Sequence, residues 1–290
     1  MDSMDDDLEQ TIRDIGLPSR PEILFKLDEE MDKETPNFRK IEQLISADMG
    51  ISAALIKIIN SPFYGLQTKV TSIRHAIGLL GLSSITRIVT GIALRNLVSA
   101  KHRVEAGSFL EESALLALVS AYLANRLRLV SSDLAFTYGL FQGCGSLLLL
   151  DRIPQYMDTL KLAKTSHKSL TQLEQEAHGM DHAKVGAIMA QEWGLHRHIV
   201  LAIRHHHEYN SIATQWTAQS AQDEALLDAL NLIAVGLMAE HVMNAETKDE
   251  GSVDWKICGA LVLERFNLDQ GHFQGILEEA TMVLKDHAEQ

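Results

Sequence analysis

The chain has 290 residues, of which 46% are hydrophobic and only 5 are proline, and its formal net charge is −13 with the histidines neutral. This composition favours a helical globular protein, and the excess of acid makes nucleic acid an unfavourable partner. The two cysteines lack the spacing of a disulfide framework, and the acidic start cannot be a signal peptide. No uninterrupted apolar run approaches the ~18 residues of a membrane helix. We therefore expect a cytoplasmic protein without a membrane partner.

Apolar residues with helical spacing dominate the first sixty residues after an acidic segment over residues 1–16. Pro21 suits the first turn of a helix, and residues 41–59 form two short helices around a turn at Asp48–Gly50. This outline is typical of a DNA-binding helix-turn-helix. We favour two packed bundle helices, because the second helix carries Lys57 as its only basic residue. A DNA-binding regulator using Ile41–Ile59 stays open as a third alternative.

The next signals are a helix end and a new helix start. Asn60 is expected to bond the free carbonyls at the end of the preceding helix, and Pro62 cannot continue that helix. Ser72 is expected to cap a helix that Gly81 closes. A longer helix, capped by Ser83 or Ser84, should then run to about residue 98.

The most apolar stretch runs from Tyr138 to Leu150 and reads YGLFQGCGSLLLL. Its length and spacing predict a helix that is buried on all sides at the centre of a bundle. Each of its two inner glycines costs about 1 kcal/mol relative to alanine, which indicates the close approach of another backbone or of a ligand. We interpret Cys144 as a packing residue and not as a nucleophile, because apolar surroundings disfavour the thiolate.

Histidines gather in the second half of the chain. Asp181 should cap the helix that begins at His182, and a run of three histidines, 205–207, ends the next helix. Imidazole is the commonest ligand for transition metals. Successive helical residues point about 100° apart, however, so at most one or two members of the run can face one site.

Three segments in a fixed order resemble the HDOD family, which comprises bacterial signalling domains related to the HD metal-dependent phosphohydrolases. The segments are LPSRPEIL, DMGISAALIKIINSPFYG and SIRHAIGLLGLSSITRIV, and the resemblance extends from about Leu17 to Tyr209. It implies an all-α, multi-helix bundle with an HD-like core and an N-terminal helical subdomain. The implied divisions are an N-terminal half over residues 17–105, an HD-like half over 106–212, and C-terminal helices over 213–290 that pack on the HD-like half.

The resemblance also implies a degenerate metal site. An HD phosphohydrolase binds its metal through an adjacent His-Asp pair, whose positions align with Gln142 and Gly143 in this chain. An amide is a poor substitute for imidazole, and glycine has no side chain to offer. Two other family positions hold Glu112 and Ser146 in place of a histidine and a lysine, whereas the remaining family histidines match His182, His206 and His207.

The function that the resemblance implies is non-catalytic signal transduction through protein–protein interaction, without a cofactor. The implied partner is a sensor kinase, a response regulator or a cyclic-nucleotide enzyme. The alternative is a metal-dependent phosphohydrolase of the phosphodiesterase or nucleotidase type, with Mn, Fe, Zn or Mg held by Glu112, His182, His206 and His207. Candidate partner contacts are the family motif at Asn60, Ser61, Pro62, Tyr64 and Gly65, and the former metal cleft at Gln142, His182 and His206.

Overall fold

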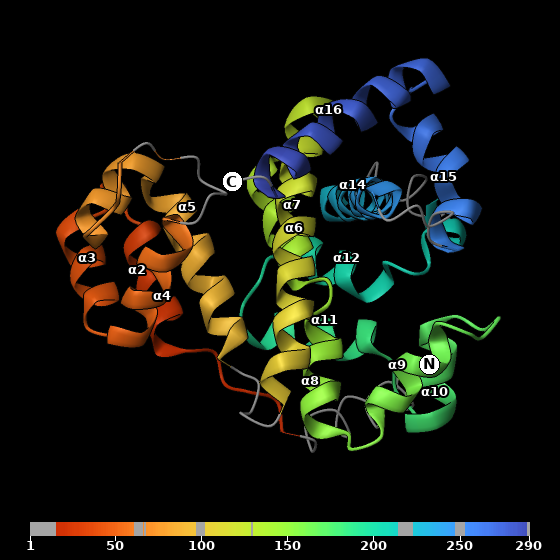
Figure 1. Cartoon of the computed structure of the whole chain (residues 1–290), viewed down its shortest axis with the longest axis horizontal. Helices are drawn as coiled ribbons and strands as arrows, with labels where there is room; N and C mark the ends of the chain where they lie inside the picture. Colours follow the sequence, from red (N-terminus) through yellow and green to blue (C-terminus); the bar gives the residue numbers. More distant parts are fainter. Residues whose placement is uncertain are drawn as a thin grey trace. The chain divides into compact units, whose positions relative to one another are not determined.

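The computed structural model describes residues 16–60, 66, 68–96, 102–128, 130–213, 223–246 and 253–288. Every extended regular element in these ranges is an α-helix (Figure 1), which confirms the predicted all-α class. The chain divides into two compact units. One unit comprises Ser19–Leu97 with Val283–Gln290, and the other comprises Met1–Pro18 with Val98–Met282.

The N-terminal unit is built from four helices that share one apolar core. They are α2 (Glu22–Met31), α3 (Phe38–Ser46), α4 (Met49–Ile59) and α5 (Ile73–Arg95). The Ser72 hydroxyl accepts from the backbone N–H of His75, which confirms the predicted cap of α5. Gly81 has φ +76° and interrupts the helical backbone of α5 where the sequence predicted a helix end. Pro21 lies one residue before α2 and not in its first turn.

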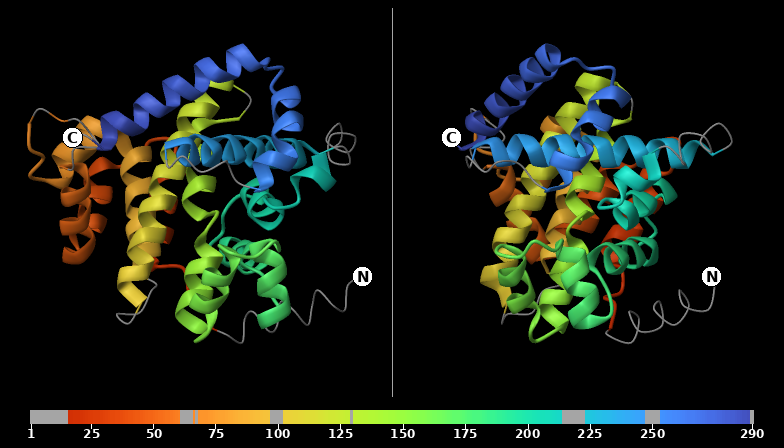
Figure 2. Two further views of the ribbon diagram at one scale, coloured as in Figure 1. Left: turned by 45° about the vertical axis from the view of Figure 1, so that its right-hand side comes forward. Right: turned by 90° about the vertical axis from the view of Figure 1, so that its right-hand side faces the viewer.

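The second unit contains the predicted bundle. Its helices are α6 (Arg103–Leu127), α7 (Ser132–Phe141), α8 (Cys144–Arg152), α9 (Tyr156–Ala163), α10 (Leu170–His178), α11 (His182–Glu192), α12 (Arg197–His205), α14 (Glu224–Glu246), α15 (Val253–Arg265) and most of α16 (Gln270–Ala288). α14 packs on α6, α7 and α12 and crosses α6 instead of running alongside it (Figure 2). α11 packs on α8 and α12.

The stretch Tyr138–Leu150 is buried along almost its whole length, as predicted. It is not one continuous helix, because α7 ends at Phe141 and a turn at Gln142–Gly143 precedes α8. The predicted close approach of another backbone is confirmed at Gly145. A Cβ at this position would lie 2.0 Å from the carbonyl oxygen of His182 and 2.7 Å from the backbone nitrogen of Gly186. The missing side chain therefore lets α8 and α11 cross in backbone contact.

Four helical segments are long and apolar enough to cross a membrane by length and composition alone. The count of uninterrupted apolar runs did not reveal them, because isolated polar and charged residues divide each segment. Two of them, Ser132–Arg152 and Glu224–Asn244, are 72% and 67% buried inside the protein, so most of their apolar side chains contribute to its core. The other two are Ile73–Leu94 and Gly107–Leu127.

Candidate functional site at three converging histidines

A tight corner between α10 and α11 positions His182. α10 begins with a reciprocal capping box between Ser169 and Gln172 and ends at Gly179, whose φ is +72°. The Asp181 side chain then accepts from the backbone N–H of Lys184 at 2.9 Å and caps α11, as predicted. His182 is consequently the first residue of α11, and only 5% of it is exposed.

The histidine run lies at the end of α12. His206 is the C-cap of this helix and is buried, and His207 follows it. His205 belongs to the last turn of α12 and pairs with Glu208, at 3.1 Å between Nδ1 and Oε2. Two members of the run, His206 and His207, thus contact His182, which agrees with the limit set by helical geometry.

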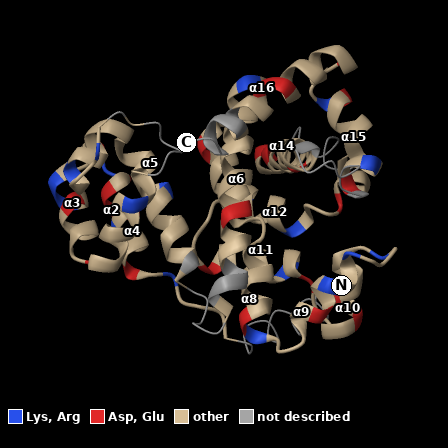
Figure 3. Cartoon of the chain, viewed as in Figure 1, with Lys and Arg blue, Asp and Glu red and all other residues tan. Residues whose placement is uncertain are grey.

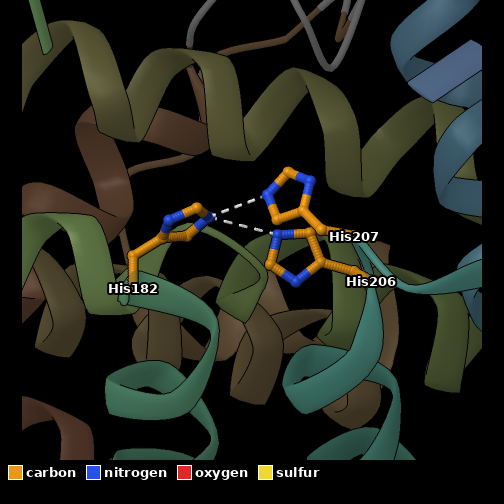
Figure 4. A group of neighbouring side chains, drawn as sticks. All are labelled: His182, His206 and His207. Carbon is orange, nitrogen blue, oxygen red and sulfur yellow. Dashed lines mark hydrogen bonds between the residues drawn. The ribbon is translucent and has the colours of Figure 1, made fainter. Parts of the chain in front are cut away.

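The Nε2 atoms of the three histidines converge on one point (Figure 4). The Nε2 of His182 lies 3.3 Å from the Nε2 of His206 and 3.1 Å from the Nε2 of His207. The three atoms all lie within 4.8 Å of one another. They come from segments 24 and 25 residues apart, which the packing of α12 on α11 brings together.

Each imidazole uses its other nitrogen, Nδ1, in a hydrogen bond to an oxygen acceptor. A backbone carbonyl accepts but never donates, and an ionised carboxylate does the same, so each Nδ1 carries a proton. The acceptors are Glu174 Oε2 for His182, the Ile203 carbonyl oxygen for His206 and Asp254 Oδ2 for His207, each at 2.7 Å.

Glu174 is a fully buried carboxylate with three donors. It accepts from the hydroxyl of Tyr156 at 2.5 Å, and from the backbone N–H and Nδ1–H of His182 at 3.0 and 2.7 Å. Burial acts to raise the pKa of Glu174, but the hydrogen bonds and the charge from His182 outweigh it and lower the pKa below its ordinary value. Burial and the Glu174 charge raise the pKa of Tyr156. The pair is therefore a neutral phenol beside a carboxylate.

His206 and His207 differ in their electrostatics. Burial and the neighbouring imidazoles hold the pKa of His206 well below its ordinary value. Burial also acts to lower the pKa of His207, but the hydrogen bond to Asp254 and the charges of Asp254 and Glu240 outweigh it and raise the pKa. Two acids on α14 and α15 therefore favour positive charge at His207, a property that the sequence pattern did not reveal.

The positions that correspond to the His-Asp pair form a separate hydrogen bond. Gln142 is buried, and its Nε2 donates to Glu240 on α14 at 2.5 Å. Its Oε1 is buried without a hydrogen-bond partner among the described residues. A Cβ at Gly143 would meet only the hydroxyl of Ser113, at 3.7 Å. The structure therefore pairs Gln142 with an acid that sequence spacing did not indicate.

The remaining predicted metal-site residues do not join the histidines. Glu112 is exposed on α6, and Ser146 is buried on α8. Neither belongs to the group whose ligand atoms lie within 4.8 Å of one another. Only about 5% of Gln142, His182 and His206 is exposed, so contact of a partner with the former metal cleft stays a prediction that requires these side chains to become accessible.

The family motif after α4 is described only at Asn60. We expected the side chain of Asn60 to bond the carbonyls at the end of α4. It bonds the backbone of Val70 instead. Its Nδ2 donates to the Val70 carbonyl and its Oδ1 accepts from the Val70 N–H, both at 2.7 Å. The Val70 backbone offers both an acceptor and a donor, so it pairs with both the nitrogen and the oxygen of the Asn60 amide. A helix end offers carbonyl acceptors alone and cannot do this. Ser61, Pro62, Tyr64 and Gly65 lie outside the described residues.

The helix-turn-helix outline corresponds to α3 and α4, with Asp48 as the N-cap of α4. Figure 3 shows α4 almost without charge, because Lys57 is its single charged residue. Its buried residues Ile51, Leu55 and Ile59 contribute to the core of the N-terminal unit, in which α4 packs on α3 and α5. The preferred interpretation, two packed helices, agrees with this burial.

A cavity that the sequence did not indicate lies in the N-terminal unit. Its volume is about 450 Å³, and it lies between α2, the turn from α3 to α4, and the end of α5. Its lining mixes apolar side chains with an ion pair of α2, in which Lys26 Nζ lies 2.5 Å from Glu22 Oε1. The other lining residues include Ile23, Leu44, Ile51 and Ala93.

Solved structures share the fold over almost the whole chain. A candidate phosphohydrolase of Shewanella amazonensis superposes with a TM-score of 0.70 at 21% identity, over 96% of this chain and 97% of that one. An HDOD domain protein of unknown function from Geobacter sulfurreducens gives 0.68 at 17%, over 97% and 93%. A candidate signal-transduction protein of Marinobacter aquaeolei gives 0.71 at 18%, over 97% of this chain and 60% of that one. At these identities the likeness shows the fold alone.

Two curated relatives are much longer than the segments that they share with this chain. The uncharacterised protein YuxH of Bacillus subtilis is 32% identical over 84 residues, which are 28% of this chain and 20% of that protein. An uncharacterised protein of Treponema pallidum is 21% identical over 194 residues, or 66% and 37%. The model of the HDOD domain matches residues 17–209, which is more than half of the chain. The chain therefore belongs to the HDOD family, as its three sequence segments suggested.

Proposed function

We propose that this HDOD protein transmits a signal by binding another protein and does not hydrolyse phosphate esters. The observation that carries the proposal is the state of Gln142 and Gly143. The Gln142 amide donates to Glu240 at 2.5 Å, and Gly143 offers no side chain. A hydrolytic metal centre needs ligands that hold the ion and leave an open position for water, and these two positions supply neither an imidazole nor a carboxylate.

The proposed partner is a signalling protein of the sensor kinase, response regulator or cyclic-nucleotide enzyme class. The proposed contacts are Ser61, Pro62, Tyr64 and Gly65, which follow Asn60 in the family motif. The side-chain amide of Asn60 is already hydrogen-bonded to the backbone of Val70. Its role in the proposal is therefore to tie the two ends of this segment together, while the partner is bound by the residues after it.

The experiment is partner capture with a matched pair of aromatic variants. Tagged wild-type protein captures the partner from its own cells, the partner is identified and purified, and its affinity is measured for each variant. Tyr64→Ala is expected to weaken binding at least tenfold. Phe38→Ala removes an aromatic ring of the same unit that is 59% exposed, and it should leave binding unchanged. Equal affinities of Tyr64→Ala and wild type would remove this contact from the proposal.

A second candidate function, a metal-dependent phosphohydrolase, is favoured by the convergence of three Nε2 atoms. The assay is hydrolysis of bis(p-nitrophenyl) phosphate and of nucleotides with Mn²⁺, Fe²⁺, Zn²⁺ or Mg²⁺ added in turn. The proposal expects no turnover above that of His206→Ala protein. Metal-dependent turnover that disappears in His206→Ala would replace the signalling proposal with the hydrolase.

A further inference from the structure

The cavity of the N-terminal unit has the size of a small-molecule site. Its volume is about 450 Å³, and every described residue that lines it falls within Ser19–Leu97. Protein cavities that bind small organic molecules commonly measure about 300–1,000 Å³. The cavity therefore belongs to a single compact unit and is large enough for such a molecule.

The floor of the cavity is aliphatic. Ile51 and Ala93 are 4% and 3% exposed, and the half-buried side chains of Ile23 and Leu44 extend this apolar lining. None of the described lining residues is aromatic. Apolar walls stabilise a bound hydrocarbon chain by removing its surface from water, whereas a planar ring would find no aromatic partner here. The floor thus favours an aliphatic tail.

The rim of the cavity carries more acid than base. Its charged residues are Glu22, Lys26 and Asp48, and all three are exposed. Lys26 Nζ lies 2.5 Å from Glu22 Oε1, so the base is matched by one of the two acids. Asp48 has no opposite charge among the described lining residues. Excess negative charge at the mouth of a cavity with apolar walls raises the local concentration of cations.

Two helix ends add to this negative potential. α3 and α5 reach the cavity through their C-caps, Ala47 and Asn96. The final carbonyl groups of a helix have no intrahelical donor and carry a partial negative charge. The N-terminal ends of α2 and α4, which favour an anion, already carry acids. Glu22 lies in the first turn of α2, and Asp48 accepts from the N–H of Ile51 at 2.9 Å.

From this combination we propose that the cavity binds a small amphipathic cation, in which a primary ammonium or guanidinium group is attached to an aliphatic tail. The charged group donates to the Asp48 carboxylate and to carbonyl oxygens at the ends of α3 and α5. The tail lies against Ile51 and Ala93. The ligand is a free small molecule and not a protein segment, because the site is concave and has the volume of a small-molecule site.

The test is a titration of the full chain with n-hexylamine, observed by NMR of isoleucine and leucine methyl groups. n-Hexanoate and 1-hexanol have the same chain length with a negative and a neutral head group, so they separate the effect of charge from that of the tail. At pH 7 the amine is protonated. Hexylamine should shift the methyl signals of Ile23, Leu44 and Ile51 to saturation. It should bind at least about tenfold more tightly than hexanoate.

Two variants of lining residues probe the charge and the space separately. Asp48→Asn keeps a capping side chain for α4, because asparagine caps helices as well as aspartate does, but it removes the charge. It should weaken hexylamine binding about tenfold and leave hexanol binding unchanged. Ala47→Leu places a larger side chain in the cavity from an exposed position and should weaken the binding of both probes about tenfold or more.

Asp32→Asn is the matched control for net charge. Asp32 is exposed in the same unit and does not line the cavity, so this variant should bind hexylamine like wild type. Circular dichroism verifies the fold of each variant, and Asp48→Asn alone decides the result if Ala47→Leu does not fold.

Four results would overturn the proposal. The methyl signals of Ile23, Leu44 and Ile51 could remain unshifted at millimolar hexylamine. Hexanoate or hexanol could bind as tightly as hexylamine, which would mean that the site does not recognise positive charge. Asp48→Asn could bind hexylamine like wild type, or Asp32→Asn could weaken binding equally. Because the readout is the binding of a small molecule to the N-terminal unit, it is independent of the partner affinity and turnover that test the proposed function.

Discussion

Gly145 on α8 lies directly against the backbone of His182 on α11. A Cβ at position 145 would come within 2.0 Å of the His182 carbonyl oxygen, whereas real Cβ atoms essentially never approach another atom within 3.0 Å. The crossing of these two helices therefore fixes the first residue of α11. The direction of the His182 ring depends on a residue that has no side chain of its own.

Gly145→Ala is expected to destabilise the fold by at least about 3 kcal/mol, because the clash is with backbone atoms that cannot rotate away. Urea unfolding measures the loss. Gly143→Ala is the control, since its Cβ would make an ordinary contact with Ser113 at 3.7 Å and its φ of −89° suits any residue. A stability of Gly145→Ala within about 0.5 kcal/mol of wild type would show that α8 and α11 can separate without cost.

The paired hydrogen bonds between Asn60 and Val70 make a second prediction. Asn60→Ala removes both bonds and should cost about 1–3 kcal/mol in urea unfolding. Asn60→Asp keeps the acceptor for the Val70 N–H but directs a carboxylate oxygen at the Val70 carbonyl. At pH 7 it should therefore be no more stable than Asn60→Ala. Asn96→Ala, at the exposed C-cap of α5, is the control. If Asn60→Asp were as stable as wild type, the donor half of the pair would be unimportant.

Glu30 on α2 predicts a pH dependence of stability. Its carboxylate is 1% exposed and lies 2.6 and 2.9 Å from the amines of Lys33 and Lys40. Hydrogen bonds with these lysines lower its pKa from 4.5 to about 2. Because the folded pKa is below the unfolded one, the stabilisation is complete above pH 4.5 and is lost as the pH falls through about 2.

Glu30→Gln should accordingly be less stable than wild type at pH 7, and the difference should shrink steadily between pH 4.5 and pH 2. Urea midpoints of both proteins across this range provide the measurement. Glu34→Gln, at an exposed position three residues after α2, should show no such trend. A difference between wild type and Glu30→Gln that stays constant with pH would mean that Lys33 and Lys40 do not stabilise the ionised carboxylate.

The two cysteines predict a simple chemical result. Cys144 is 2% exposed and Cys258 is 5% exposed, and burial raises the pKa of Cys144 to about 12 and also raises that of Cys258. A thiol reagent at pH 8 should therefore label almost no cysteine in the native protein and both after unfolding. Rapid native labelling of Cys144, read by mass spectrometry, would contradict its interpretation as a packing residue.

Local signals in the sequence predicted the helix starts well. Ser72 and Asp181 cap their helices as expected, because a cap needs only a side-chain oxygen and the next two or three backbone N–H groups. Gly179 likewise ends α10 with a positive φ. The turn at Gln142–Gly143 was missed, since an apolar stretch with helical spacing looks the same with or without a turn between two buried helices.

The parts of the site that could not be predicted depend on tertiary contacts. Asp254 is 47 residues from His207, and Glu240 is 98 residues from Gln142. No spacing rule connects residues this far apart in sequence. Glu174 is only eight residues from His182, but Gly179 separates the two helices, so the helical pattern gave no reason to pair them. The histidines were found because they match positions of the family pattern, whereas their hydrogen-bond acceptors were not found.

The hydrogen bond between His207 and Asp254 has a practical consequence for the choice of truncated forms of this protein. The family match ends at residue 209, yet the acids that polarise His207 come from α14 and α15 beyond it. A fragment cut at that boundary would keep all three imidazoles and lose two of the carboxylates that surround them. Measurements on such a fragment would describe a histidine cluster with a different charge. A fragment that preserves the site therefore extends at least through α15.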